Sequence, residues 1–419
     1  MRKSGEELYN ERKKRVEDAI ALRVPDRVPI WFQDLGFFPA NYVGISYKEA
    51  MYDSKKLFSA YKKTIIDLEP DMYFNPGHAI HTPGDALEAL GCKQIKWPGD
   101  GVPPDRPFQF IEDEYMRADE YDHLLGDPSD FVMRTFLPRV FKKLEVFGQL
   151  PSLKVLMMGY FAMPAIATVA AVPGFTGAFQ AFYQAGQALL RHIAANAEFQ
   201  KEMVEAGYPC SSGAITLAPF DLISDSLRGM KGAMLDMYRQ PEKLLRLIDV
   251  LTPMQINSPI ALAKATGNPG VFIPLHRGAD GFLSLKQFET FYWPSLKKLI
   301  LTLIDNGLTP CPFFEGDYTM RLKYLAELPK GKILGLFDGT DIYKAKEALG
   351  NTMCISGMMP LSLLQVGTPD SVRAYAKTLI DVVGKEGGFI MGPRCIMDEA
   401  KPELVKVWFD FTKEYGVYR

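Results

Sequence analysis

One recurring pattern constrains the fold of this chain more than any other feature. Short runs of β-forming residues recur, and helical spacing of apolar residues follows each run. This alternation is typical of parallel strands joined by crossover helices. We identify candidate strands at residues 28–33, 71–75, 154–158, 271–276, 309–315, 332–337, 353–357 and 388–392. Eight such strands predict an α/β fold, a (β/α)8 TIM barrel whose chemistry lies at the carboxyl ends of the strands.

The last four candidate strands are the best defined, because a helix fits between each consecutive pair. Residues 285–306 carry apolar side chains at helical spacing and end at Asn306-Gly307. Thr368 and Pro369 supply an N-cap and a first helical residue, and Gly384 follows the predicted helix end. An open doubly wound sheet fits the same pattern. The absence of G-x-G-x-x-G after an early strand counts against a dinucleotide-binding version of that sheet.

The chain shows no linker or internal repeat, so we expect a single domain over residues 1–419. A polar helix within residues 1–24 is expected to flank the barrel bottom. Residues 160–235, rich in Ala, Gly, Met and Phe, are expected to form a mostly helical insertion. Such a segment could be a lid over the barrel mouth, a docking surface, or a helix packed on the barrel wall.

Net charge and cysteine content indicate which partners and which cellular compartment to expect. Forty-eight Lys and Arg against 50 Asp and Glu give a net charge of −2, and no basic block is present. Nucleic acid and membrane are therefore not expected as partners. The apolar stretch 153–172 is interrupted by Pro164, so we do not expect a membrane span there. Five scattered cysteines and a polar N-terminus indicate a cytoplasmic protein with reduced thiols.

Residues at the predicted strand ends are the candidates for chemistry. Glu315 and Asp317 follow the fifth strand, Cys354 lies in the seventh, and Cys395 follows the eighth in Gly-Pro-Arg-Cys. Two thiolates with one carboxylate would make a three-ligand zinc site with an open fourth position. The adjacent Arg394 is expected to lower the pKa of Cys395. Cys354 could also be only a buried small side chain.

Other polar residues at strand ends have functional and structural interpretations. His276, followed by Arg277, ends the fourth strand and could transfer a proton or bind a ligand. Asp338 could support the site or cap the next helix. His78 and His81 are expected to be solvated loop residues, and Cys92, Cys210 and Cys311 to serve packing. G-x-S-x-G, P-loop and H-E-x-x-H motifs are absent, which disfavours hydrolases, kinases and zinc proteases.

Several motifs together resemble a known family. They are VPDRVPI at 24–30, LDMYRQPEKLL at 235–245, ISG at 355–357 with Pro360, GTP at 367–369, and GPRC at 392–395 followed by KPE at 401–403. In this order they resemble the uroporphyrinogen decarboxylase superfamily over nearly the whole chain. The resemblance implies a (β/α)8 barrel. It also implies one of two activities, porphyrinogen decarboxylation or corrinoid-linked methyl transfer.

The resemblance also indicates which of the two activities to expect. The decarboxylases carry Arg after the first strand to hold substrate carboxylates. Here that segment is Trp31-Phe32-Gln33-Asp34-Leu35-Gly36-Phe37-Phe38, without a cation. An aromatic and acidic wall disfavours a substrate with eight carboxylates. Trp31, Gln33 and Phe37, with Arg277 and Asp338, are instead expected to bind a flat apolar methyl donor.

The methyltransferases of the superfamily hold zinc through a His-x-Cys pair after the fifth strand and a Cys after the last. Here Cys395 matches, while Glu315-Gly316-Asp317 replaces the first pair, so Glu315, Cys354 and Cys395 are the expected zinc ligands. We expect transfer of a methyl group from a small methoxylated, aromatic compound to a corrinoid (cobalamin) on a separate partner protein. His276 or Asp317 would protonate or orient the leaving oxygen.

Three alternatives stay open. Methyl could move in reverse, from the corrinoid protein to a thiol or pterin. The chain could be a decarboxylase that needs no metal, or a non-catalytic tetrapyrrole-binding protein. A homodimer is compatible with all of these.

Overall fold

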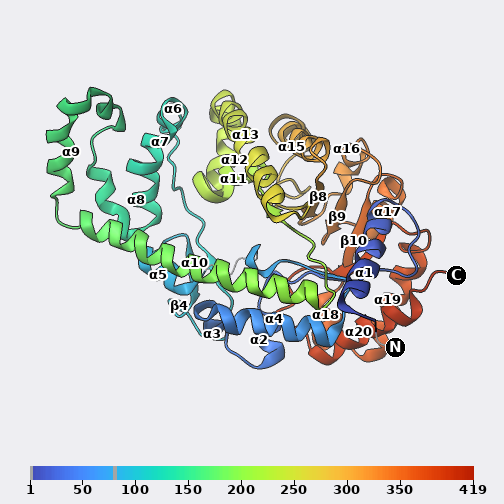
Figure 1. Cartoon of the computed structure of the whole chain (residues 1–419). Helices are drawn as coiled ribbons and strands as arrows, with labels where there is room; N and C mark the ends of the chain where they lie inside the picture. The colour runs from blue at the N-terminus through green and yellow to red at the C-terminus, as the bar shows by residue number, and fades with distance from the viewer. Residues whose placement is uncertain (1–2, 79–82) are drawn as a thin grey trace.

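A closed ring of parallel strands forms the centre of the protein in the computed structural model, which describes residues 3–78 and 83–419 (Figure 1). Six strands pair in the order β11-β10-β9-β8-β7-β6, and β1 pairs with β2. Parallel bridges from Ile30 to Met391 and from Tyr73 to Cys210 join these two sheets at both edges. The described strands therefore close into a (β/α)8 barrel, as the sequence predicts. The strands are β1 (Trp31–Phe32), β2 (Met72–Tyr73), β6 (Ala214–Ile215), β7 (Gly270–Leu275), β8 (Thr309–Phe314), β9 (Leu334–Phe337), β10 (Cys354–Met359) and β11 (Phe389–Pro393).

Alternation along the strands separates the barrel interior from its outer core. Trp31, Phe272 and Phe313 belong to an interior cluster, whereas their neighbours Phe32, Ile273 and Phe314 pack outward against helices. This period of two is expected for strands that are buried on both faces. Residues that continue the inward series beyond the strand ends therefore lie at the barrel mouth.

Helices surround the barrel, and a further set of helices forms an extended arm. α1 (Gly5–Ile20) begins with a capping box of Ser4 and Glu7, and its Val16 and Ala19 join the interior cluster. The other helices are α2 (Phe38–Val43), α3 (Tyr47–Tyr52), α4 (Ser54–Leu68), α11 (Pro219–Leu222), α12 (Gly229–Arg239), α13 (Pro241–Thr266), α14 (Leu285–Gln287), α15 (Trp293–Asp305), α16 (Leu322–Leu325), α17 (Ile342–Leu349), α18 (Leu361–Val366), α19 (Pro369–Val382) and α20 (Pro402–Tyr415), with the short turns η5 (Ile223–Leu227), η6 (Phe288–Tyr292) and η7 (Thr319–Arg321). α19 starts at the predicted Thr368 cap.

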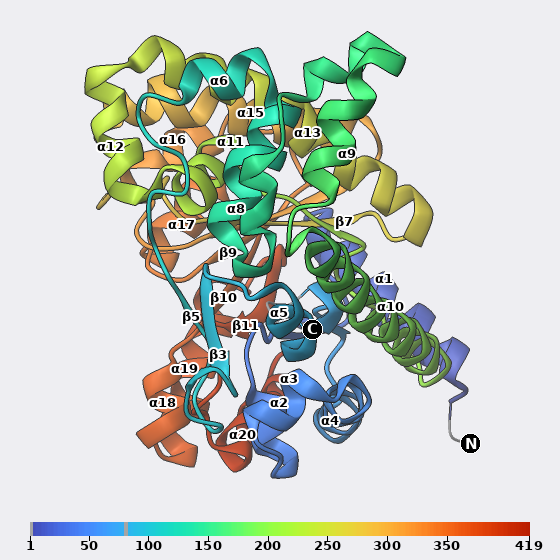
Figure 2. The ribbon, with the colours of Figure 1, turned by 90° about the vertical axis from the view of Figure 1, so that its left-hand side faces the viewer.

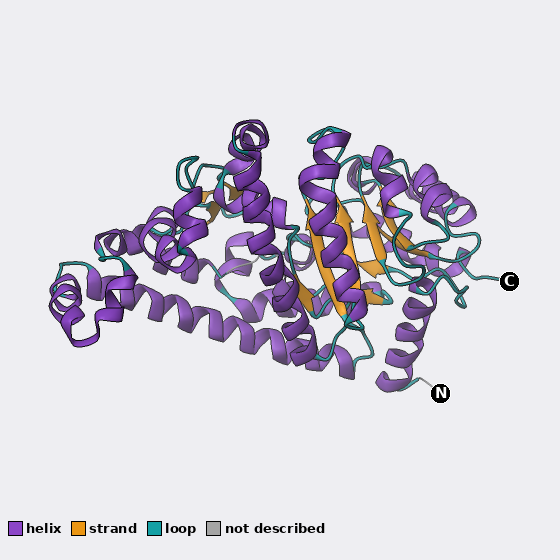
Figure 3. Ribbon diagram, turned by 90° about the horizontal axis from the view of Figure 1, so that it is seen from above, coloured by secondary structure: helices purple, strands orange, loops and turns teal. Residues whose placement is uncertain are grey.

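A long arm separates β2 from β6 and projects away from the barrel (Figures 1 and 3). We call residues 83–205 the arm; they follow η1 (Pro76–His78). The arm comprises α5 (Gly84–Leu90), β3 (Ile95–Pro98), β4 (Gly101–Val102), β5 (Gln109–Phe110), α6 (Tyr121–Gly126), α7 (Pro128–Phe131), η2 (Val132–Phe136), α8 (Leu137–Val140), η3 (Lys142–Gln149), η4 (Leu153–Ala162), α9 (Met163–Ala170) and α10 (Phe175–Glu205).

The third predicted strand is wrong. Residues 154–158 lie in the helical segment η4 (Leu153–Ala162), and β6 (Ala214–Ile215) supplies the missing barrel strand. β6 lies inside the segment 160–235 that was expected to be an insertion, whereas the excursion from the barrel occupies the arm. Residues 154–158 are mostly apolar, but not because they are buried in a strand. Leu156, Met157 and Met158 are each more than half exposed.

Candidate active site

Polar side chains gather where β7, β8 and β9 end. His276, Glu315 and Asp338 directly continue the inward series of their strands, two positions beyond Pro274, Phe313 and Leu336. Because the carboxyl ends of neighbouring parallel strands meet at one rim, all three residues lie at the mouth of the barrel. The sequence predicts this placement correctly for each of them.

His276 lies between two carboxylates. Its Nδ1 is 2.5 Å from Asp225 Oδ2, and its Nε2 is 3.4 Å from Glu315 Oε1. Burial lowers the pKa of His276, but the hydrogen bonds to Asp225 and Glu315 outweigh burial and raise it to about 11. The imidazole is therefore a charged proton donor at neutral pH. Its Nε2 contact is the longer of the two, so Nε2 is the side on which a substrate atom can replace Glu315.

A buried carboxyl fixes the backbone that carries His276. Asp221, in α11, accepts hydrogen bonds from the backbone N–H groups of His276 and Arg277, each at 3.0 Å. It also accepts one from the hydroxyl of Tyr292 at 2.6 Å. Burial, together with the nearby Asp225, raises the pKa of Asp221 to about 7. Asp221 is therefore a positioning residue beneath the proton donor.

Arg277 is turned toward protein carboxylates. Its guanidinium lies 3.2 Å from Asp225 and 3.7 Å from Glu112, and its Nε donates to Ser224 at 3.2 Å. These contacts fix Asp225 from the side opposite His276. The expectation that Arg277 binds substrate stays a prediction, and the structure gives it this second role.

The thiol of Cys395 lies in an acidic environment. Burial raises its pKa, and the carboxylates of Asp338, Glu315 and Asp398 add to the effect. The expectation that Arg394 lowers this pKa is therefore wrong, because burial, the largest effect, and those carboxylates raise it. Asp338 accepts a hydrogen bond from the Gly316 backbone at 2.5 Å, and its own pKa is raised by burial and by Glu315. Asp338 and Glu315 thus lie near enough to Cys395 to act on its thiol electrostatically.

Cys354 lies at the other end of the barrel, which corrects the predicted zinc set. It begins β10, whose mouth end is Met359, and at about 3.3 Å per residue the start of the strand lies roughly 16 Å below its end. Its side chain is fully buried in the interior cluster with Leu334 and Val16. Burial raises the pKa of its thiol well above the usual range. In the described chain no three His, Cys, Asp or Glu side chains converge to hold a metal ion, so the residues present do not fit a three-ligand zinc site.

The structure shows a carboxyl pair that the sequence reasoning missed. Asp34 follows β1 and is fully buried, and burial with the neighbouring Asp398 raises its pKa to about 8. Asp398, which accepts a hydrogen bond from the Phe37 backbone, has its pKa raised by burial to about 6. Gly36 allows this approach, because a Cβ there would lie 1.9 Å from Asp398 Oδ1. Near neutral pH the pair therefore holds about one proton beside Cys395.

The predicted aromatic wall is not open to substrate in this structure. Trp31 and Phe37 are each 1% exposed, and Gln33 is 3% exposed. Trp31 fills the barrel interior, while Phe37 stacks on Tyr47 with ring centroids 4.3 Å apart. Both rings serve packing, Trp31 inside the barrel and Phe37 at the start of α2 against Tyr47.

The remaining predicted residues have local roles. The Asp317 carboxylate accepts hydrogen bonds from the backbone and hydroxyl of Thr319, and the residue is exposed. Cys311 is buried inside the barrel, and Cys210 and Cys92 are half-buried, as packing residues would be. His78 ends a short 3-10 helix, and His81 lies outside the described residues.

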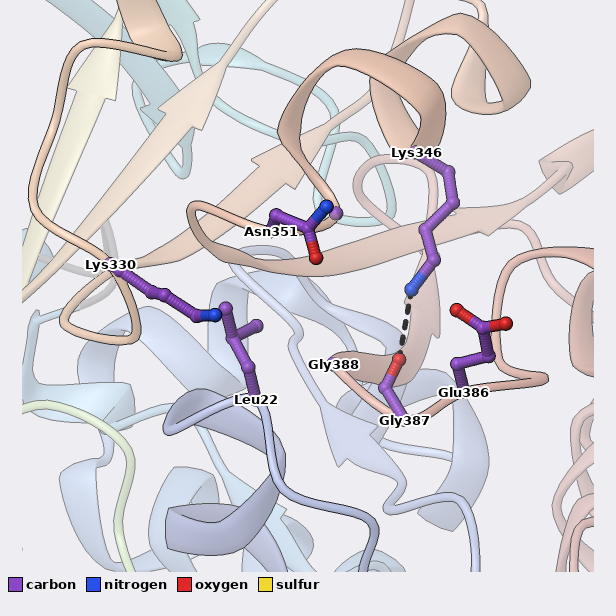
Figure 4. Close-up of a pocket in the computed structure, with 8 residues that line it drawn as sticks. Leu22, Lys330, Lys346, Asn351, Glu386, Gly387 and Gly388 are labelled. Atoms are coloured by element: carbon purple, nitrogen blue, oxygen red, sulfur yellow. Dashed lines mark hydrogen bonds between the residues drawn. The ribbon is translucent and has the colours of Figure 1, made fainter.

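A cavity of about 150 Å³ lies away from the mouth (Figure 4). Its lining includes Leu22 after α1, Lys346 of α17 and Gly388 just before β11. Lys346 precedes β10 and Gly388 precedes β11, while Leu22 follows α1. The cavity therefore lies at the amino ends of the strands. Lys346 Nζ donates to the Gly387 carbonyl at 2.9 Å across it. It is distinct from the His276 site.

Comparison with known proteins places the site in a family context. A family model for uroporphyrinogen decarboxylase (URO-D) matches residues 205–415, about half of the chain, which include β6 to β11 and His276, Glu315, Asp338 and Cys395. A uroporphyrinogen decarboxylase of Syntrophotalea carbinolica is 27% identical over 168 residues, covering 40% of this chain and 47% of that protein. One from Cellvibrio japonicus is 26% identical over 208 residues, covering 48% and 57%. These matches span about half the length of the relatives.

A solved structure extends the comparison to the whole fold. A methyltransferase from Methanosarcina mazei aligns over 96% of this chain and 98% of its own, with a TM-score of 0.60 and 16% sequence identity. At this identity the likeness concerns the fold. Together with the family model and the closed barrel, it shows that the chain belongs to the uroporphyrinogen decarboxylase family.

Proposed function

We propose that this chain is a methyltransferase that takes a methyl group from a small methoxylated, aromatic compound and delivers it to the cobalt of a separate corrinoid protein. The observation that carries the proposal is the His276 imidazolium, held at the mouth between Asp225 at 2.5 Å and Glu315 at 3.4 Å. An ether oxygen is a poor leaving group without a proton, and this histidine is a charged donor at neutral pH. The methyltransferase of similar fold supports the same reaction class.

The proposed step balances with one proton and one electron pair. A reduced corrinoid on the partner would supply the electron pair for the methyl carbon, and the carbon–oxygen bond would break with its pair remaining on oxygen. His276 Nε2 gives its proton to that oxygen, so the product leaves as a neutral phenol. Asp225 stabilises the imidazolium before transfer and holds the ring through Nδ1. Reprotonation from water restores the donor.

Charge at the mouth supports a neutral substrate. Asp225, Glu315, Asp338 and Asp398 are half-buried acidic side chains at the mouth, against the cations His276, Arg277 and Arg394. Asp34 and Asp221 are fully buried, and their raised pKa values leave them partly protonated near neutral pH. A donor with several carboxylates would meet like charge there, whereas a methoxylated ring would not.

The experiment supplies purified chain with free cob(I)alamin and a panel of methoxybenzenes under anaerobic conditions. Methylcobalamin formation is followed by absorbance and phenol release by chromatography. We expect stoichiometric formation of both products with at least one donor. His123→Gln is the matched control, because His123 pairs with Asp130 in the arm at 2.8 Å, far along the chain from the mouth. Absence of both products with every donor would contradict the proposal.

A second candidate is decarboxylation of a porphyrinogen, which the names of the curated relatives favour. It is tested by incubating the same preparation with uroporphyrinogen and measuring carbon dioxide. We expect none, because the surplus of carboxylates at the mouth disfavours a substrate with several of its own.

A further inference from the structure

The far end of the arm exposes an unusually large apolar surface. η4 and α9 form that end, opposite both chain termini, and α10 runs beneath them (Figures 1 and 2). Met157 is 82% exposed, Tyr160 84% and Phe161 76%. We call the following exposed residues the apolar tip: Leu156, Met157, Met158, Tyr160, Phe161, Met163, Phe179, Phe182, Tyr183, Leu189, Leu190 and Ile193.

α10 has large apolar side chains on the face that points to solvent. Ala178, Ala181, Ala185 and Ala188 are buried, and α10 packs there against α5 and α4. Phe179, Phe182, Tyr183, Leu190 and Ile193 follow helical spacing along the exposed face. A helix that is apolar on both faces is normally buried on both. Phe179 and Phe182 contact the ring of Phe147 at one edge of this face. Each still keeps 37% or more of its surface exposed, and Leu190 and Ile193 are each 61% exposed, so most of the face is open to solvent.

The size of the apolar tip matches that of a stable interface. At about 200 Å² for a large side chain, the exposed fractions of its residues correspond to roughly 1,400 Å². The largest apolar patch of a typical monomer is about 300–600 Å². A standard interface needs about 800 Å² from each partner. One copy of the tip thus offers more than enough surface for a lasting contact.

The tip is also without free charge. No Asp or Glu occurs between Glu145 and Glu198, and the cations in that span are Lys154 and Arg191. Lys154 is 3.4 Å from Asp127, and Arg191 is 2.6 Å from Asp85, so both are neutralised within the chain. Two such surfaces meet without like-charge repulsion, and neither needs a partner of opposite charge.

We propose that the apolar tips of two copies of this chain pack against each other, forming a symmetric dimer in which the barrels lie at opposite ends. In a two-fold contact the same patch serves both partners, and a neutral apolar surface is complementary to itself. Depletion of charge with enrichment of Phe, Tyr and Met is the composition of an interface core.

A membrane fits these observations less well. Leu153–Ala170 has a mean hydropathy of 1.6 over 18 residues and is 6% buried, which by length and composition alone would suit a membrane span. The segment is broken at Gly159, where φ is 58°, and α9 that follows has eight residues. A span needs about 20 residues of continuous helix. Surface-bound helices also use free Lys and Arg toward lipid headgroups, and both cations here are paired.

The test is sedimentation equilibrium of the full chain from nanomolar to micromolar concentration. We expect a dimer for the wild type, and a dissociation constant at least about 100-fold higher for Phe161→Glu, because the charge enters the contact twice. Val366→Glu is the matched control, since Val366 in α18 is 81% exposed but lies outside the tip. It should remain dimeric. Far-ultraviolet circular dichroism confirms that each variant is folded.

Two results would overturn the dimer. One is a wild type that stays monomeric throughout the concentration range, and the other is a dimer that Phe161→Glu leaves unchanged. A monomer that floats with vesicles of phosphatidylcholine and phosphatidylglycerol, and ceases to float with Phe161→Glu, would replace the dimer by a membrane contact. Hydrogen exchange gives an independent check, because Leu153–Ala170 should exchange faster when the wild type is diluted.

Discussion

His276 Nδ1 lies 2.5 Å from Asp225 Oδ2, although the two residues are 51 positions apart and belong to different βα units. η5, which follows β6, supplies Asp225, and β7 delivers His276. The contact favours the charged form of a histidine at a strand end and raises its pKa. It also links the site to a strand that the sequence pattern does not reveal.

Asp225→Asn should lower the pKa of His276 from about 11 toward its ordinary value of about 6.5. The reason is the loss of the carboxylate that favours the imidazolium most strongly. The measurement is a proton NMR titration of the His276 ring, assigned with His276→Gln. Asp370→Asn is the control, because Asp370 is 96% exposed at the start of α19. An unchanged titration in Asp225→Asn would contradict this account of the site.

The carboxyl of Asp34 should make stability depend on pH. Its folded pKa of about 8 lies above its unfolded value of about 3.9, so the folded chain retains a proton that the unfolded chain releases. Stability should therefore fall as pH rises from about 4 to about 8. Asp34→Asn should remove this slope and be more stable than wild type at pH 8, on the order of 2 kcal/mol. Urea unfolding at pH 5 and pH 8 measures the difference, and parallel curves would refute it.

Gly36→Ala should separate Asp398 from Asp34. A Cβ at position 36 would lie 1.9 Å from Asp398 Oδ1 and 2.3 Å from the side chain of Ile396, so the loop must move. We expect a loss of about 1–3 kcal/mol in unfolding free energy and loss of the elevated pKa of Asp34. Gly126→Ala is the control, because nothing lies within 4 Å of a Cβ there. Equal stability of the two variants would mean that the carboxyl pair is not held as described.

Cys354→Ala and Cys395→Ala should behave differently. Cys354 is fully buried in the barrel interior, so its replacement should cost about 1–2 kcal/mol of stability and leave methyl transfer unchanged. Cys395 is half-buried within electrostatic reach of Asp338 and Glu315, so its replacement should change methyl transfer with little effect on stability. Methylcobalamin formation is measured alongside urea unfolding. Loss of methyl transfer in Cys354→Ala alone would contradict the placement of Cys354.

The sequence predicts most of the barrel because seven of its eight strands lie in recognisable runs of β-forming residues. β7 to β11 are apolar runs, and each is followed by helical structure, of which α14, α17 and α19 begin at a side-chain cap. β6 is missed because its apolar segment, Ala214-Ile215, is interrupted by Thr216 and preceded by Ser212-Gly213. Residues 154–158 attract a strand assignment because they are apolar, and their apolar character belongs to an exposed surface instead.

The site is predictable to the same extent as the strands. His276, Glu315 and Asp338 each follow their strand by one residue, and the same rule applied to β1 gives Gln33. Asp34 lies one residue further and out of phase with the inward series, so the rule does not find it. Asp221 and Asp225 follow β6, so missing that strand hid both. The prediction for Cys354 is wrong because the sequence pattern places it in a strand but does not show at which end. Cys354 is the first residue of β10, so it lies at the end of the barrel opposite the mouth.

The account depends on His276 giving a proton to the leaving oxygen, and the dependence of rate on the leaving group tests this most directly. Methyl transfer to cob(I)alamin would be measured with 1,4-dimethoxybenzene and with 4-nitroanisole, for wild type and His276→Gln. We predict that His276→Gln loses about 100-fold or more with the first donor and much less with the second, whose phenolate leaves without a proton. An equal loss with both donors, or none with either, would contradict the central claim.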